Sequence, residues 1–244
     1  MKAMYTLKAI FAVVVLVMTM GFGGCMWDIT GRGPAPLERT LVPTQQHLRA
    51  GHVYCMRGWL GIFSTGMDTL ADKIDKPPVG IPCVSVANEE WGRLKRWLVA
   101  EHQKGSIKDP LVLLGHSWGA DDQIRVAQYL KDAGITVDLL VLIDPVTPPK
   151  VPTNVKRVYC VYKSHPTTDW FPFWRGVPAD VEDPRKTPLE NINLRTANLG
   201  FDTSQVGHVN IEKSDLVHKM VIDEIKKTCL PRSWSGKQGE GITK

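Results

Sequence analysis

Short apolar runs alternate with longer amphipathic segments between residues 52 and 228. The strand-like runs are residues 52–56, 82–87, 111–114, 139–143 and 155–162, and residues 191–195 form a further candidate strand. Helical spacing of apolar positions is found in residues 66–74, 89–103, 120–131 and 212–227. Strands that alternate with helices predict an α/β fold, in which a mostly parallel central sheet carries helices on both faces.

The two ends of the chain depart from this alternation. Lys2 and Lys8 precede an apolar run and a stretch of small residues that ends at Cys25, which is the pattern of a secretory signal peptide over residues 1–25. Residues 26–50 contain few periodic apolar positions and predict an extended segment or linker. A single globular domain is expected at residues 51–230, followed by a flexible tail at residues 231–244.

The small residues before Cys25 resemble the lipobox of bacterial lipoproteins. This resemblance implies that Cys25 is lipidated and anchors the chain to a membrane, while plain cleavage nearby and a retained anchor are the alternatives. Each of these places the domain outside the cytoplasm, in the periplasm or cell envelope or as a secreted protein. The four other cysteines then allow three disulfide pairings, and buried free thiols are an equal alternative for Cys55 and Cys160.

Composition excludes several classes of protein. Hydrophobic residues make up 43% and charged residues 23% of the 244 positions, as in one globular domain and unlike a disordered or multi-span chain. The net charge of +5 comes without a dense basic block, so no nucleic-acid partner is expected. Neither a phosphate-binding loop, nor a dinucleotide motif, nor a zinc-hydrolase motif is present, so no cofactor and no metal are expected.

The strongest chemical signal is the stretch Leu-Gly-His-Ser-Trp-Gly-Ala, in which Ser117 is the central residue. It follows an apolar strand and opens directly into a helix, which is the context that a nucleophile elbow requires. Gly115 and Gly119 are small where the strand and the helix must pass close together. The chain resembles the α/β-hydrolase superfamily here, over residues 52–228, and this resemblance implies the α/β-hydrolase fold and a Ser-acid-His chain order.

The acid and the histidine are sought downstream of Ser117, because a serine hydroxyl needs a base, and the base needs an orienting carboxylate. Asp144 follows the strand after the nucleophile, as the acid does in pancreatic-type lipases and thioesterase domains. Asp169 follows the next strand, where most other members carry the acid, and is the alternative. His208 lies just before the last helix, where the resemblance places the histidine, whereas His116 belongs to the elbow and is set aside.

Acyl transfer also needs N–H donors for the oxyanion. One is expected from the backbone of Trp118, the residue after the nucleophile, and the second from Trp59, in the loop after the strand at residues 52–56. Relatives usually carry a histidine at the start of this loop, where this chain has Arg57. The local hydrogen bonding is therefore expected to differ from theirs.

Together these residues predict a serine hydrolase of the esterase, lipase or thioesterase type, which cleaves carboxylic ester or thioester bonds through an acyl-enzyme. The aromatic residues at positions 170–174, with Trp59 and Trp118, favour an apolar acyl group in a small-molecule or lipid ester substrate. The alternative is a non-catalytic envelope lipoprotein that uses the same fold as a binding scaffold.

Overall fold

The computed structural model describes residues 33–59, 64–108, 110–164, 169–170 and 175–232 of the chain. Within them lies a sheet with the order β2-β1-β3-β4-β5-β6, in which all neighbouring strands are parallel. The strands are β1 (His52–Met56), β2 (Cys83–Val86), β3 (Leu111–His116), β4 (Leu139–Ile143), β5 (Val158–Tyr162) and β6 (Leu189–Asn193). The predicted class, a parallel sheet between helices, is confirmed.

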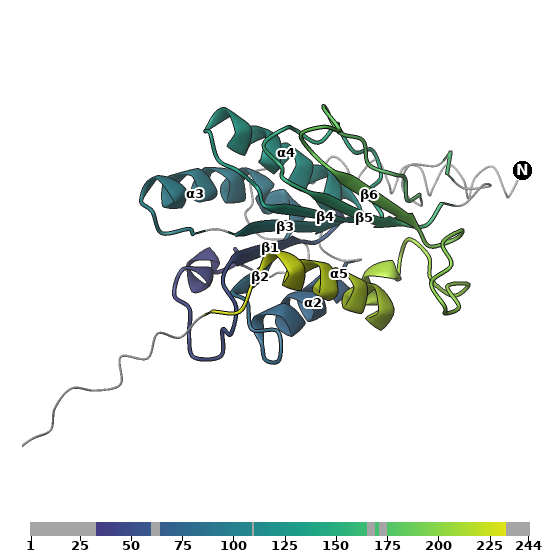
Figure 1. The fold of residues 1–244 in the computed structure, drawn as a ribbon, viewed down its shortest axis with the longest axis horizontal. Coiled ribbons are helices and arrows are strands. Elements are labelled where there is room, and N and C mark those ends of the chain that lie inside the picture. The colour runs from purple at the N-terminus through teal and green to yellow at the C-terminus, as the bar shows by residue number, and fades with distance from the viewer. Residues whose placement is uncertain (1–32, 60–63, 109, 165–168, 171–174, 233–244) are drawn as a thin grey trace, which may run out of the picture.

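Helices cover both faces of the sheet (Figure 1). The α-helices are α2 (Gly66–Asp75), α3 (Trp91–Gln103), α4 (Trp118–Asp132) and α5 (Asp215–Thr228). Three short 3₁₀ helices are η1 (Leu37–Thr40), η3 (Asn88–Glu90) and η4 (Ile211–Lys213). In Figure 1, α3 and α4 lie above the sheet and α2 and α5 lie below it.

A hydrophobic core lies on each face of the sheet, and alternate residues of each strand contribute to one or the other. In β1, Tyr54 and Met56 pack with α3 and α4, while Val53 and Cys55 pack with α2 and α5. Successive side chains of a strand point to opposite faces, and a strand covered on both faces is therefore apolar at every position. This is why the inner strands appear as unbroken apolar runs in the sequence.

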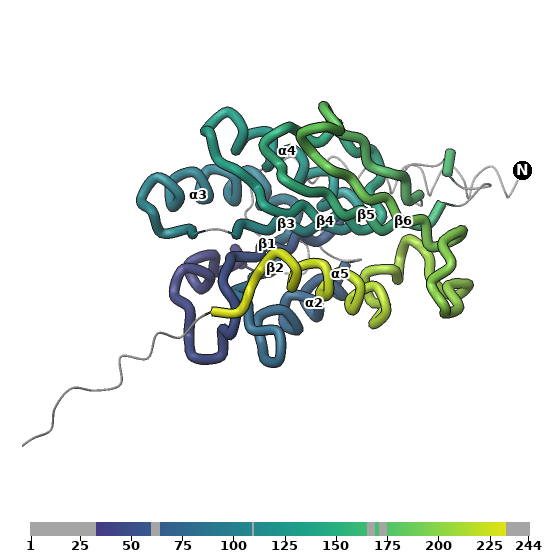
Figure 2. Tube along the Cα trace, viewed as in Figure 1, coloured from purple at the N-terminus to yellow at the C-terminus, as the bar shows by residue number. Residues whose placement is uncertain are grey.

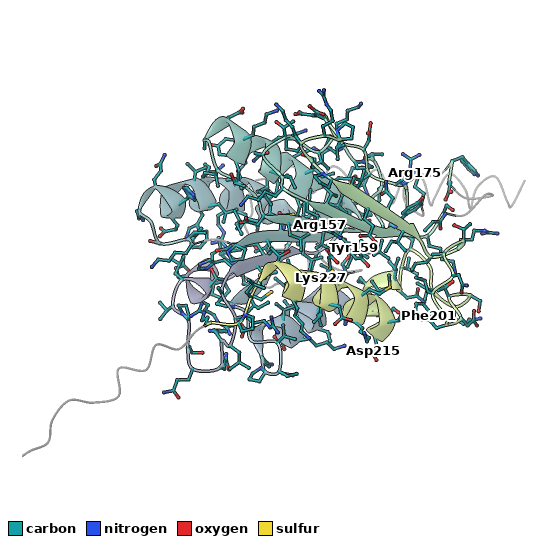
Figure 3. All side chains as sticks on the ribbon, viewed as in Figure 1. Arg157, Tyr159, Arg175, Phe201, Asp215 and Lys227 are labelled. Atoms are coloured by element: carbon teal, nitrogen blue, oxygen red, sulfur yellow. The ribbon has the colours of Figure 1, made fainter. Side chains whose placement is uncertain are left out.

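The last helix is attached to the sheet by charged side chains as well as by its apolar face. Glu224 of α5 is buried and lies 2.7 Å from Arg157 Nε, just before β5, and 2.7 Å from Lys227 Nζ. Figure 3 shows Arg157 and Lys227 close to Tyr159, on the side of the sheet that α5 covers. The attachment of α5 therefore fixes the C-terminal end of the segment between β6 and α5.

Residues 33–50, predicted as a linker, pack against the domain. Ala35 N–H donates to Glu90 of η3, and the hydroxyl groups of Thr40 and Tyr54 lie 2.8 Å apart. Packed chain therefore begins before the boundary expected at residue 51. The expected signal peptide, Cys25 and most of the C-terminal tail lie outside the described residues, and no helix within the described ranges is long and apolar enough to cross a membrane.

The four cysteines of the described chain are free thiols, and all are buried. Cys55 Sγ and Cys83 Sγ lie 3.5 Å apart on neighbouring strands, but the register pairs Cys83 with Val53. Two residues along a strand and one step across it separate two Cα atoms by about 8 Å, beyond the reach of a disulfide. The free-thiol alternative considered for Cys55 is therefore the one found.

Candidate active site

Ser117 occupies a sharp turn between β3 and α4. Its backbone has φ 57° and ψ −128°, a region that costs a non-glycine residue energy, and its N–H donates to the carbonyl of Ile143 at 3.0 Å. A β-carbon on Gly115 would lie 2.4 Å from the carbonyl oxygen of Gly119, and one on Gly119 would lie 2.3 Å from that of Arg57. Backbone atoms fill both spaces, so the turn requires the two glycines.

Two hydrogen bonds join the serine to a histidine and a carboxylate. Ser117 Oγ lies 2.9 Å from His208 Nε2, and His208 Nδ1 lies 2.7 Å from Asp144 Oδ2. Asp144 is fully buried, and its other oxygen accepts from the N–H of Lys163 at 2.7 Å. A carboxylate only accepts, so Nδ1 of His208 carries the ring proton and Nε2 can accept one from the serine.

These three residues reach one place from separate elements at the same edge of the sheet. Ser117 follows β3, Asp144 follows the neighbouring β4, and His208 lies between β6 and α5. Carboxyl ends of parallel strands share one edge, and a serine on a strand-to-helix turn at that edge, followed in the chain by an acid and a histidine, is the α/β-hydrolase arrangement. The chain has the α/β-hydrolase fold.

Comparisons with known proteins add little to this description. No family model and no curated protein sequence matches the chain. Among solved structures, it is similar to the NocB thioesterase domain (10% identity, TM-score 0.44, covering 74% of this chain and 95% of that one). It is also similar to Est1E from Butyrivibrio proteoclasticus, with 10% identity and a TM-score of 0.44 over 76% of this chain and 90% of that one. The type II thioesterase BorB shares 12% identity, with a TM-score of 0.43 over 81% of this chain and 98% of that one. Likenesses at this level say nothing of activity.

Of the two carboxylates considered for the acid, Asp144 is the one that contacts the histidine. Both ring nitrogens of His208 are engaged, Nδ1 with Asp144 and Nε2 with Ser117, which leaves none for Asp169. The backbone carbonyl of Asp169 accepts from Arg175 instead, at 3.3 Å. The carboxylate that contacts His208 is therefore the one that follows β4.

The two expected oxyanion donors belong to segments next to Ser117. Trp118 is the first residue of α4, and the first N–H groups of a helix point outward at the positive end of its dipole. Gly58 precedes Trp59, and a β-carbon on Gly58 would lie 3.1 Å from Ser117 Cβ. The loop after β1 thus passes directly against Ser117.

Most of the expected aromatic lining lies outside the described residues, in residues 60–63 and 171–174. Trp170, which is described, is 78% exposed.

His116, set aside in the sequence, supports this site from behind. Its Nδ1 lies 2.8 Å from the hydroxyl of Ser64, and its Nε2 lies 3.1 Å from the carbonyl oxygen of His208. Burial keeps the pKa of His116 well below 6.5, so the ring is neutral, donates from Nε2 and accepts at Nδ1. One imidazole therefore links the nucleophile turn to the start of α2 and to the backbone of His208.

Asp121 fixes the turn that follows the acid. It is fully buried in α4 and accepts from the N–H of Val146 at 3.2 Å and from the N–H and hydroxyl of Thr147 at 2.8 and 3.1 Å. Burial raises the pKa of Asp121 to about 6, although these hydrogen bonds and Arg125 act to lower it. The backbone immediately after Asp144 is thus held by a second carboxylate.

Gly176 packs against the acid itself, which nothing in the sequence indicated. A β-carbon at this position would lie 1.6 Å from Asp144 Oδ1. Arg175, labelled in Figure 3, donates from Nε to the carbonyl of Val146, and Val177 N–H donates to that of Pro145. The segment is bound to the turn after Asp144 on both sides of the glycine, so it cannot simply retreat.

Replacing Gly176 by alanine should therefore displace the Asp144 carboxylate. A shift of about 1 Å in a catalytic group costs roughly 10²-fold in rate, and we expect kcat for ester hydrolysis to fall by that order. Steady-state kinetics measures it, with Gly92→Ala in α3 as the matched control, because a β-carbon there meets only Arg96 Nη1, at 3.6 Å. Equal kcat for Gly176→Ala and wild type would contradict the contact.

Glu212, in η4 shortly after His208, is a buried acid with an unusual pKa. Its side chain is fully buried, with Lys213 Nζ 3.9 Å from Oε1. Burial raises the pKa of Glu212 from 4.5 to about 7, against the opposing effects of Lys213 and His208. A raised folded pKa means that the stability supplied by the protonated group is complete below about pH 4.5 and is lost as the pH rises through about 7.

The Glu212→Gln protein should be more stable than wild type at pH 8 and about equal to it at pH 5. The neutral amide keeps the shape of the acid and removes the cost of its ionisation, which we expect to be roughly 2–3 kcal/mol at pH 8. Thermal unfolding at both pH values measures the difference, with the exposed Glu182→Gln as control. The same Tm difference at pH 5 and pH 8 would contradict the assignment.

No group of three or more metal-binding side chains occurs in the part of the chain that the structure describes.

Proposed function

We propose that the chain is a serine hydrolase that cleaves carboxylic ester or thioester bonds, with Ser117 as nucleophile, His208 as base and Asp144 as the orienting acid. The observation that carries this proposal is the unbroken path of two hydrogen bonds from Ser117 Oγ through His208 to the buried Asp144. The Ser117 backbone strain supports it, since a turn that costs energy is retained at functional sites.

The first half of the reaction forms the acyl-enzyme. Ser117 Oγ bonds to the carbonyl carbon of the substrate as His208 Nε2 takes its proton, and Asp144 stabilises the resulting imidazolium. The negative carbonyl oxygen is bound by the N–H groups of Trp118 and Trp59, each worth about 3–4 kcal/mol. The bond to the leaving alcohol or thiol then breaks, and His208 returns the proton to it.

The second half uses the same groups with water. His208 Nε2 removes a proton from water, the hydroxide oxygen bonds to the acyl carbon, and the bond to Ser117 Oγ breaks as the proton returns to the serine. The products are a carboxylic acid and the free enzyme. The aromatic residues around positions 59, 118 and 170 support an apolar acyl group in the substrate.

The experiment is to treat residues 26–244 with a fluorophosphonate probe and to assay p-nitrophenyl esters from acetyl to palmitoyl, with an acyl-CoA as the thioester. The expected result is covalent labelling and hydrolysis by wild type, with Ser117→Ala as the blank for both. The preferred chain length then separates esterase, lipase and thioesterase. Absence of labelling and of hydrolysis in wild type would instead leave the non-catalytic scaffold.

We also propose that the domain acts outside the cytoplasm and is anchored through a lipid on Cys25. The pattern of residues 1–25 supports this. Expression of the full chain in bacteria with labelled palmitate should give a labelled protein, and Cys25→Ser should abolish the label. An unlabelled but exported wild-type protein would indicate plain cleavage.

A further inference from the structure

The segment that carries His208 contacts the apolar core through Leu199 and Val206, which are both half-buried. Residues 199–210, here named the base loop, are all exposed or half-buried, and they form no strand or helix. Phe201 is 38% exposed and lies at the outer edge of the molecule (Figure 3), and Figure 2 shows the whole loop projecting between β6 and α5. Segments with few fully buried residues open readily, so the position of His208 also depends on polar contacts.

Some of these contacts are internal to the loop. Asn210 accepts from Gly207 N–H at 2.6 Å and donates to the carbonyl of Gln205 at 3.0 Å. One further contact leaves the loop, because the Thr203 hydroxyl donates to the carbonyl of Leu194, just after β6, at 2.7 Å. They give the loop a shape, but they do not tie it to Asp144, the residue that His208 must reach.

Lys163, directly after β5, makes that connection with both of its ends. Its backbone N–H donates to Asp144 Oδ1 at 2.7 Å. Its ammonium group donates to the carbonyls of Thr203, Ser204 and Val206, at 2.5, 3.3 and 2.6 Å. An ammonium has three N–H groups, and each has an acceptor on the base loop.

This differs from what surface lysines ordinarily do. Lys131, for example, pairs with Glu182 at 2.6 Å, and both side chains are well exposed, so the pair contributes little to stability. The Lys163 ammonium instead donates to backbone carbonyls, in charge-assisted hydrogen bonds that are stronger than neutral ones. The last of these carbonyls belongs to Val206, two residues before His208.

We propose that Lys163 is a positioning residue, which sets the distance between Asp144 and His208 by holding the carboxylate with its backbone and the base loop with its ammonium. The proposal rests on the proposed function, because the distance matters only if His208 transfers protons. Lys163 contacts Asp144 and the base loop, so its effect on the reaction passes through the Asp144–His208 pair. A loop displaced by about 1 Å would cost roughly 10²-fold in proton transfer without weakening substrate binding.

The test removes the ammonium group of Lys163 and keeps an unbranched apolar side chain in its place. Lys163→Met should lower kcat by about 10- to 100-fold with KM unchanged, whereas Lys131→Met, the matched control, should keep both values. Lys163→Ala should regain activity with added n-propylammonium and not with n-propanol, since only the cation supplies three N–H donors. A Tm close to that of wild type in all three variants shows that they fold.

A second readout does not depend on hydrolysis. The Nδ1 proton shared by His208 and Asp144 should give a strongly downfield ¹H NMR signal in wild type and in Lys131→Met, and Lys163→Met should broaden or lose it. Unchanged kcat and signal in Lys163→Met would overturn the proposal, as would a fall in kcat with the signal intact. Wild type that shows the signal but neither labels nor hydrolyses would refute the proposed function and leave the placement by Lys163 standing.

Discussion

The His208→Ala protein should lose kcat for ester hydrolysis by about 10⁵- to 10⁶-fold, and adding Ser117→Ala should lower it little further. The two residues act as one unit, because Ser117 Oγ is a poor nucleophile once Nε2, now 2.9 Å away, no longer accepts its proton. The single variants and the double variant are compared in single-turnover assays, where trace contamination by wild type is excluded by the fluorophosphonate probe.

His102 offers the control for this series, since it lies exposed in α3, away from the carboxyl edge of the sheet. His102→Ala should keep the wild-type kcat. If the loss in the Ser117→Ala, His208→Ala double variant equalled the product of the two single losses, the residues would act independently, and the shared proton path would be refuted.

Asp144→Asn should lower kcat by about 10⁴-fold, and Asp169→Asn should leave it unchanged. Asp144 accepts from two donors at once, His208 Nδ1–H on one oxygen and Lys163 N–H on the other. An asparagine has one oxygen, so its NH₂ group must face one of these donors. Turned toward His208, it stabilises the wrong tautomer, in which Nε2 carries the proton and cannot accept one from Ser117.

Steady-state kinetics of the two variants at several pH values distinguishes the acids directly. A large loss in Asp169→Asn with activity kept in Asp144→Asn would return the acid to the position after β5. Wild-type activity in both would mean that neither carboxylate is the orienting partner.

The sequence predicted best what periodicity and local geometry determine. The strand at residues 52–56 has the predicted bounds because all five of its positions are buried and four of them form an unbroken run of apolar and aromatic residues. β6 starts at Leu189 and ends at Asn193, not at residues 191–195, because none of its residues is fully buried and the sequence LENIN has no clear alternation of apolar and polar positions. α4 begins at Trp118, earlier than expected, because the helix starts as soon as the serine turn ends.

The support of the site could not be predicted in the same way. Lys163 and Gly176 lie far from His208 in the sequence and act through backbone contacts, which side-chain patterns do not encode. The sequence placed His116 in the nucleophile turn but could not predict its hydrogen-bond partners. Ser64 and His208 come close to it only in the folded chain. Sequence patterns therefore gave the three side chains of the proposed reaction and little of what holds them in place.

The packing of Ala35 against Glu90 limits how far the domain could stand from a membrane. A fully extended chain spans at most about 3.3–3.6 Å per residue, so the ten residues from Cys25 to Ala35 reach no further than about 35 Å. With a lipid on Cys25, the domain would stay within roughly its own diameter of the bilayer. The most accessible esters would then be those close to the bilayer surface, because the tether formed by residues 25–35 keeps the effective enzyme concentration high there.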